Sequence, residues 1–105
     1  MNIVLVGLMG SGKSAVGRLL AVRLGRPLVD TDALVEAAAG CSIAEIFAAE
    51  GEEGFRRREA EAVAQAAAGD NQVIATGGGA VLRAENRAAL RRNGLVIWLD
   101  AEPES

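Results

Sequence analysis

A glycine-rich segment near the start of the chain contains its only lysine. Residues 7–14 read GLMGSGKS and match the pattern G-x-x-x-x-G-K-[ST] at every fixed position. Glycines in such a segment let backbone N–H groups converge on phosphate oxygens, and the start of the following helix adds partial positive charge. Lys13 would then reach the β- and γ-phosphates of a nucleotide, and the Ser14 hydroxyl would bind Mg²⁺. The alternative, a glycine-rich turn with a solvated lysine, is disfavoured because the complete pattern is rare by chance.

Two more polar or glycine-rich segments follow apolar segments that have the composition of strands. Asp30, Thr31 and Asp32 stand where one of them ends, and TGGGA at 76–80 includes the end of another. Ligands of open α/β sheets bind beyond the carboxyl ends of the strands, so both segments are expected beside the phosphate loop. The two carboxylates could instead only cap a helix over 33–39, but neither has the Glu or Gln three residues on that completes a capping box. The glycines alone predict a tight turn, but beside a phosphate loop they would let a substrate approach backbone amides.

The segment FRRRE at 55–59 carries three consecutive arginines. Glu52 stands four residues before Arg56, and Glu61 stands four residues after Arg57. Pairs with this spacing are common on solvated helix faces. The charge pattern by itself therefore predicts that all three arginines lie on the surface.

Apolar residues predict an alternation of strands and helices along the chain. Apolar, mostly β-branched runs predict strands at 2–6, 27–30, 72–76 and 95–100, the first and the last of them buried. Helical spacing and stop signals predict helices over 13–25, 32–40, 43–49, 52–68 and 85–93. This order gives right-handed crossovers onto a parallel sheet. The expected fold class is therefore α/β, a P-loop NTPase-type parallel sheet with helices on both faces, similar to the nucleoside monophosphate kinases.

Two local patterns refine this outline. Ser42 and Glu45 have the spacing of a capping box, which predicts that a helix begins at residue 43. The helix over 13–25 is expected to present an apolar face made of Val16, Leu19, Leu20 and Leu24.

The composition argues against several other kinds of site. The net charge is −3 and only Phe47, Phe55 and Trp98 are aromatic, so neither a nucleic-acid footprint nor a base-stacking platform is expected. The chain has no histidine, which removes a Ser–His triad and most zinc sites. Its single cysteine, Cys41, is expected to pack against a helix and fits a reducing cytosol. The apolar start is too short for a signal peptide or a membrane span, so we expect a cytoplasmic protein without membrane or nucleic-acid partners.

The motifs occur together in a specific order. The phosphate loop, LVDTD at 28–32, SIAEIFAAEGE at 42–52, FRRRE and TGGGA closely resemble shikimate kinase in kind and spacing. The resemblance covers essentially the whole chain, and the combination is specific, whereas the loop alone would indicate only a nucleotide-binding superfamily. It implies ATP-dependent phosphorylation of the 3-hydroxyl of shikimate, in aromatic amino-acid biosynthesis. Shikimate and ATP are then the expected ligands, Mg²⁺ the expected cofactor, and the full-length protein is expected to be a monomer.

The resemblance also implies which residues bind ATP and the metal. The ATP phosphates would contact Gly10, Ser11, Gly12, Lys13, Ser14 and Ala15. Ser14 and Asp30 would serve Mg²⁺, and Lys13 would act as a catalytic residue.

Substrate-binding residues follow in the same way. Asp32 would bind the shikimate hydroxyls and accept the proton of the attacking one, as a second catalytic residue. Arg56 would bind the shikimate carboxylate, with Glu59 one turn on holding it in place. The resemblance thus makes Arg56 a ligand, against the charge pattern, and leaves Arg57 and Arg58 on the surface. The pocket for the ring would be completed by Gly77, Gly78 and Gly79.

The chains of this family continue beyond the point that matches residue 105. They go on to an arginine-bearing lid, a second substrate-binding arginine, a last strand and an adenine-contacting loop. Residues 1–105 are therefore expected to be a partial P-loop kinase domain that binds nucleotide weakly and turns over little shikimate. Two alternatives stay open: another small-metabolite kinase of the superfamily, such as one for gluconate, or a phosphate- or nucleotide-binding fragment without catalysis. A GTPase-like switch is disfavoured because its N-K-x-D motif would need a second lysine.

Overall fold

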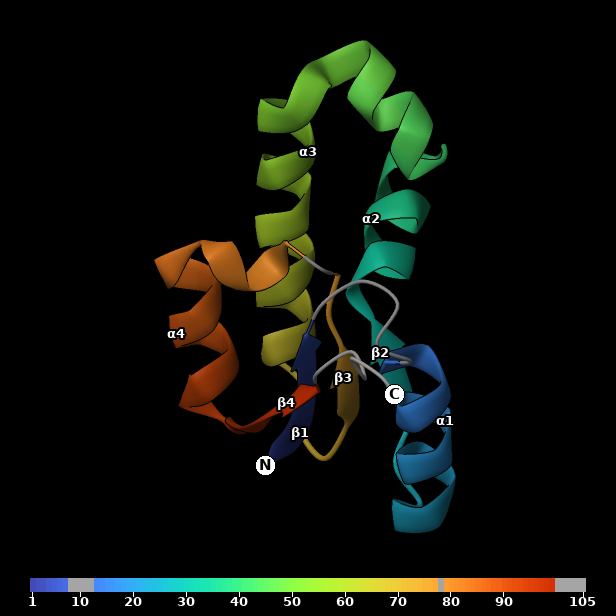
Figure 1. The fold of residues 1–105 in the computed structure, drawn as a ribbon, viewed down its shortest axis with the longest axis vertical. Coiled ribbons are helices and arrows are strands. Elements are labelled where there is room, and N and C mark those ends of the chain that lie inside the picture. The colour runs from blue at the N-terminus through green and yellow to red at the C-terminus, as the bar shows by residue number, and fades with distance from the viewer. Residues whose placement is uncertain (8–12, 78, 100–105) are drawn as a thin grey trace, which may run out of the picture.

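The described part of the chain folds into helices around a parallel sheet (Figure 1). The computed structural model describes residues 1–7, 13–77 and 79–99, with the backbone alone at residues 13, 14 and 99. Its elements are β1 (Asn2–Gly7), α1 (Lys13–Leu24), β2 (Leu28–Asp30), α2 (Thr31–Ala39), α3 (Ile43–Ala67), β3 (Val73–Ala75), a 3₁₀ turn (Ala80–Leu82), α4 (Ala84–Arg92) and β4 (Gly94–Leu99). The strands are parallel and lie in the order β2-β3-β1-β4. The expected α/β fold class is confirmed.

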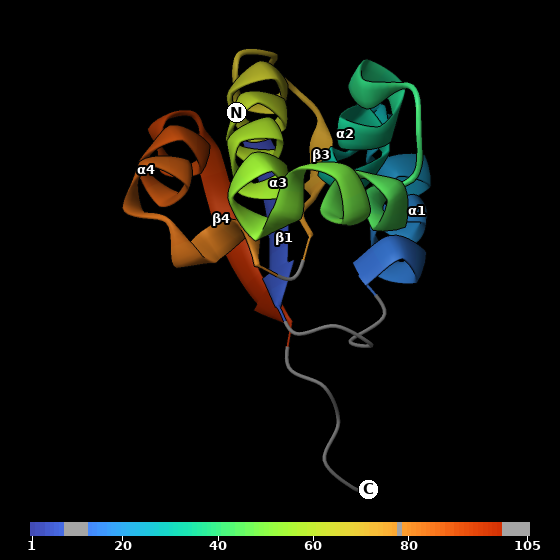
Figure 2. The same ribbon diagram turned by 90° about the horizontal axis from the view of Figure 1, so that it is seen from above.

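Helices cover both faces of the sheet, as expected. The side chains of β1 alternate between the faces: Val4 and Val6 pack toward α3 and α4, whereas Leu5 packs toward α1. All three side chains are fully buried. Figure 2 shows α4 and α1 at opposite sides of the strands. This burial on both faces explains why β1 reads as a continuous apolar run.

Two expectations about buried positions are wrong. Leu95 and Trp98 in β4 are 52% and 59% exposed, because β4 is an edge strand of the described sheet and pairs only with β1. On α1, Leu19 and Leu24 are exposed, whereas Val16 and Leu20 pack against the sheet. The spacing of apolar residues therefore predicted a wider buried face than the helix has.

A kinked helical arm rises from the carboxyl ends of the strands. Gly51 has φ 72° and ψ −175°, which breaks α3 between the two helices expected over 43–49 and 52–68. The expected capping box at Ser42 is present, and the ring centroids of Phe47 and Phe55 stack 4.8 Å apart across the kink. In Figure 1, α2 rises away from the sheet and the second part of α3 returns to it. This return brings Arg56 of FRRRE against Gly79, after the end of β3.

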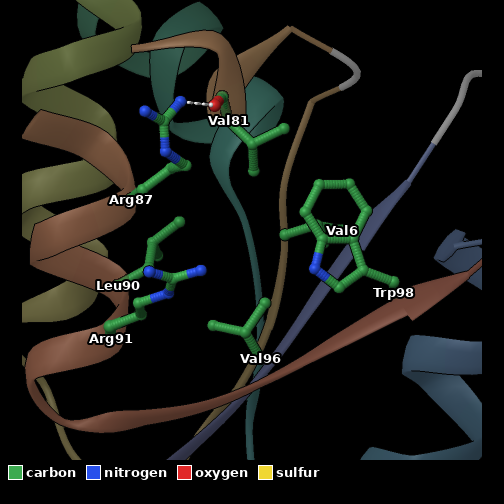
Figure 3. Close-up of a pocket in the computed structure, with 7 residues that line it drawn as sticks. All are labelled: Val6, Val81, Arg87, Leu90, Arg91, Val96 and Trp98. Carbon is green, nitrogen blue, oxygen red and sulfur yellow. Dashed lines mark hydrogen bonds between the residues drawn. The ribbon is translucent and has the colours of Figure 1, made fainter. Parts of the chain in front are cut away.

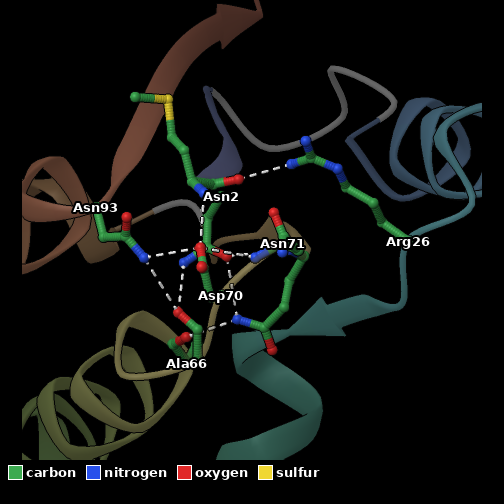
Figure 4. Close-up of polar contacts among 9 residues, drawn as sticks. Asn2, Arg26, Ala66, Asp70, Asn71 and Asn93 are labelled. Carbon is green, nitrogen blue, oxygen red and sulfur yellow. Dashed lines mark hydrogen bonds and ion pairs between the residues drawn. The ribbon is translucent and has the colours of Figure 1, made fainter.

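A polar cluster holds the strands together at their amino ends (Figure 4). The Asp70 carboxylate accepts from the Met1 ammonium at 2.6 Å and from Asn93 Nδ2 at 3.0 Å. Because the carboxylate is held chiefly by that ammonium, then by Asn93 and the Asn71 amide, the pKa of Asp70 falls to about 2. The buried Asn2 side chain also joins β1 to the start of β3, since its Oδ1 accepts from the Gln72 amide at 3.0 Å. The carboxyl ends of the same strands form a rim at the opposite end of the sheet.

Candidate functional site

Three chain segments meet at the carboxyl ends of neighbouring strands. Asp30, the last residue of β2, pairs in register with Ala75 of β3, which pairs with Leu5 of β1. The segment DTD, the glycine turn that begins after β3 and the end of β1 therefore lie side by side. This is the arrangement that the order of strands and polar segments predicts.

Asp30 caps α2. Its Oδ1 accepts from the amides of Asp32, at 2.9 Å, and Ala33, at 3.4 Å. Asp30 therefore does cap a helix, although it lacks a capping box, because an aspartate N-cap satisfies helix amides without a Glu partner. Both of these bonds end on the same oxygen.

The Asp32 carboxylate lies against Gly77. A Cβ built on Gly77 would overlap with Asp32 Oδ1 and would lie 3.1 Å from its Cγ. The Gly77 amide in turn donates to Thr31 Oγ1 at 3.1 Å, inside the protein. A larger residue at this position would push the carboxylate away from the turn.

Arg56 faces the next described glycine of the same turn. A Cβ built on Gly79 would lie 2.8 Å from Nη2 and 2.9 Å from Cζ of Arg56. The guanidinium donates from Nη1 to Glu59 Oε1 at 2.7 Å, and the Glu59 side chain is 1% exposed. Glu52 is a more distant and exposed partner, with its Oε2 3.5 Å from Arg56 Nε. The hydrogen bond to Glu59 is the main cause that raises the pKa of Arg56.

The charge pattern was therefore wrong about Arg56, which is only 21% exposed in its side chain. It was right that Glu52 pairs with Arg56 and that Arg57 is exposed. Arg58 is partly buried and donates to both carboxylate oxygens of Glu50, at 3.0 and 2.8 Å. This second pair spans the kink of α3, so Arg58 supports the arm while Arg56 turns toward the glycine turn.

Part of the predicted site lies outside the described residues: Gly10, Ser11, Gly12 and Gly78. Lys13 and Ser14 are described only as the first two residues of α1, and Ala15 is exposed in its first turn. The context that the phosphate-loop pattern requires is nevertheless present: β1 ends at Gly7, and α1 begins at Lys13.

Two buried hydroxyl groups on this rim were not predicted from the sequence. Thr31 is fully buried and Thr76 is 3% exposed. Thr76 Oγ1 donates to the Leu5 carbonyl at 3.0 Å, and the Thr76 amide donates to the same oxygen at 3.2 Å. The available signal was a threonine beside each strand end, where a buried polar side chain has to find a backbone partner.

Other candidate features are few in the part of the chain that the structure describes. It contains no group of three or more Cys, Asp or Glu side chains that could hold a metal ion. None of its helices combines the length and apolar character that crossing a bilayer requires. The expected role of Cys41 in packing is confirmed, since it lies partly buried against the cluster around Phe55.

A recess between α4 and β4 uses none of the predicted site residues (Figure 3). It is lined by Val6, Val81, Arg87, Leu90, Arg91, Val96 and Trp98. Arg87 is held at its edge, because Nη1 donates to the Val81 carbonyl at 2.6 Å. The recess is therefore separate from the groups gathered at the glycine turn.

Comparison with known proteins identifies the family. The family model described as shikimate kinase matches residues 9–105. The chain belongs to the shikimate kinase family. A curated shikimate kinase of Symbiobacterium thermophilum is 85% identical over 105 residues, which is 100% of this chain and 60% of that relative. The chain thus spans about 60% of the length of this curated relative.

Solved structures agree with the family and with the fold. Shikimate kinase from Acinetobacter baumannii in complex with shikimate superposes with a TM-score of 0.91 at 47% identity, over 93% of this chain and 55% of that one. A gluconokinase from Sinorhizobium meliloti superposes with a TM-score of 0.60 at 21% identity, over 92% of this chain and 55% of that one. The second likeness shows the fold alone, so it does not support the gluconate alternative.

Proposed function

We propose that the protein containing this chain transfers the γ-phosphoryl group of ATP to the 3-hydroxyl of shikimate. The observation that carries the proposal is the close approach of Asp32 to Gly77 and of Arg56 to Gly79. A carboxylate and a guanidinium therefore each lie against a glycine of the same segment, two residues apart in the chain. A substrate with both a carboxylate and hydroxyl groups suits this pair. Membership of the shikimate kinase family and the shikimate complex of the A. baumannii relative support the choice of substrate.

Arg56 is the proposed ligand of the shikimate carboxylate. Its hydrogen bond to the buried Glu59 fixes one edge of the guanidinium, and its planar shape suits a second, bidentate carboxylate. The exposed Glu52 is the weaker of the two carboxylate partners, and a substrate carboxylate would replace it. Binding at Arg56 would orient the ring over the glycine turn.

Asp32 is the proposed base. Its carboxylate would accept the proton of the 3-hydroxyl as the oxygen attacks the γ-phosphorus, while the bond from that phosphorus to the β–γ bridging oxygen breaks and ADP leaves. Its backbone is fixed, because its amide donates to the Asp30 cap at 2.9 Å. Lys13, at the start of α1, would neutralise charge on the transferred group, and Gly10, Ser11, Gly12, Ser14 and Ala15 would bind the other phosphate oxygens.

Mg²⁺ fits the donor set on the rim. The ion usually binds through one or two protein oxygens together with substrate phosphates and water, so it does not need the three-residue cluster that the described residues lack. Asp30 caps α2 through Oδ1 in both of its described bonds, so Oδ2 would be the oxygen that serves the ion. Ser14 and Asp30 would hold the ion, and the ion would neutralise charge between the phosphates. We also propose, from the resemblance to the family, that the full-length protein is a monomer in the cytoplasm.

The proposal is tested by the rate at which the full-length protein releases ADP with shikimate and with gluconate as acceptors. We expect shikimate to be the better acceptor by at least about 100-fold in kcat/KM, since a site built for one arrangement of hydroxyls rejects another. Lys13→Ala should lower kcat by about 10²-fold or more. Equal turnover of both acceptors would contradict the substrate assignment, and turnover of neither would support a fragment that binds without catalysis.

A further inference from the structure

The hydroxyl of Thr31 links the start of α2 to the glycine turn of the proposed substrate site. Thr31 lies between Asp30 and Asp32 and is fully buried. Its Oγ1 accepts a hydrogen bond from the Gly77 amide at 3.1 Å. The next residue, Asp32, packs its carboxylate against the same glycine. Two consecutive side chains at the start of α2 therefore hold Gly77. Thr31 binds its amide, and Asp32 packs against its Cα.

A second link fixes the same turn to β1. Thr76, next to Gly77, donates both its hydroxyl and its amide to the Leu5 carbonyl, at 3.0 and 3.2 Å. Leu5 lies two residues before Gly7, where the predicted phosphate loop begins. The hydrogen bonds at Thr76 and Thr31 thus form a continuous connection from the end of β1, through the turn, to the element that carries Asp32.

We propose that Thr31 is a positioning residue for phosphoryl transfer. Its hydroxyl sets the distance from Asp32 to the glycine turn and, because Arg56 packs against Gly79 of that turn, the distance from Asp32 to Arg56. This inference rests on the proposed function. Asp32 lies in α2 and Arg56 lies in α3, and both side chains pack against the glycine turn. A hydrogen bond that fixes the turn to α2 therefore fixes the separation between Asp32, the proposed base, and Arg56, the proposed partner of the substrate carboxylate.

The two threonines differ in what their hydroxyl groups contribute. The Leu5 carbonyl keeps the Thr76 amide as a donor when the Thr76 hydroxyl is removed. The Gly77 amide has Thr31 Oγ1 as its described acceptor, and this amide is buried. Removing the Thr31 hydroxyl leaves a buried donor to find another acceptor, which favours a shift of the turn. Thr76→Val is therefore a matched control, with the same change of side chain on the same rim.

The experiment compares Thr31→Val, Thr31→Ser and Thr76→Val by steady-state kinetics with shikimate and ATP. We expect Thr31→Val to lower kcat/KM for shikimate by about 10- to 100-fold, because a displacement of about 1 Å can cost that much, while KM for ATP changes less than about twofold. Thr31→Ser keeps the hydroxyl and should recover most of the loss. Thr76→Val should lower kcat/KM for shikimate less than about threefold.

Amide hydrogen exchange of Gly77, followed by NMR, tests the link without any turnover. Exchange should be slow in the wild type and in Thr31→Ser, and faster in Thr31→Val. Equal losses for shikimate and ATP in Thr31→Val, no recovery in Thr31→Ser, or unchanged Gly77 exchange would each overturn the inference. A wild type that phosphorylates shikimate with Thr31→Val unaffected would overturn this inference alone, whereas a wild type without shikimate turnover would overturn the proposed function as well.

Discussion

Replacing Gly79 with alanine should weaken the binding of shikimate while leaving the fold intact. Gly79 has φ −97° and ψ 0°, a conformation that alanine also adopts. The new Cβ would lie 2.9 Å from Arg56 Cζ, whereas ordinary contact begins at 3.4 Å, so the guanidinium has to move by about 0.5 Å or more. Since it is the end of a flexible side chain, the free energy of unfolding should change by about 1 kcal/mol or less.

Substrate binding is more sensitive to this displacement than folding is. A bidentate carboxylate requires a well-placed guanidinium, and a displacement of about 1 Å can cost about 10²-fold, so we expect shikimate to bind about tenfold more weakly. Titration calorimetry with shikimate measures the change, and urea unfolding measures stability. Gly69→Ala is the matched control: its Cβ would meet the Gln72 side chain, 2.8 Å from Cδ, at the amino ends of the strands. Unchanged shikimate affinity in Gly79→Ala, or an equal loss in Gly69→Ala, would refute the reasoning.

Three further changes test the supports of the site. Glu59→Ala removes the buried partner of Arg56 and should lower the free energy of unfolding, measured with urea, by about 2–3 kcal/mol. This is less than the loss for fully buried pairs because Arg56 is partly exposed, and a change near zero would contradict the role of Glu59. Ser42→Ala should cost about 1 kcal/mol by the same assay, through loss of the α3 cap, and an unchanged midpoint would argue against the capping box. The pKa of Asp70 is lowered in the folded state from 3.8 to about 2, so its contribution to stability is present above pH 4 and is lost as the pH falls through 2. The stability difference between wild type and Asp70→Asn should therefore shrink over that pH range, and a constant difference would contradict the Met1 ion pair.

The order of elements and the rim they form could be predicted from the sequence. Apolar runs and the Ser42 capping box are local signals, and each appears where it was expected. Burial was less predictable, because it depends on neighbours distant in sequence. Leu95 and Trp98 have the composition of a central strand, but β4 is at the edge of the described sheet.

The site itself could be predicted only in part, for a related reason. Local spacing assigns Arg56 to a solvated helix face, and only the kink at Gly51 and the return of α3 bring it to the glycine turn. The resemblance to a family supplied this assignment, since no local pattern contains it. The bond between Thr31 and Gly77 joins residues 46 apart in the chain, so the sequence carries no direct sign of it.

A crystal structure of the protein with bound shikimate tests the central claim most directly. We expect the shikimate carboxylate to contact the Arg56 guanidinium and the ring to lie over the glycine turn. The 3-hydroxyl should lie within hydrogen-bond distance of the Asp32 carboxylate. Shikimate bound away from the turn, or with its carboxylate toward Asp32 and its hydroxyls toward Arg56, would contradict this claim.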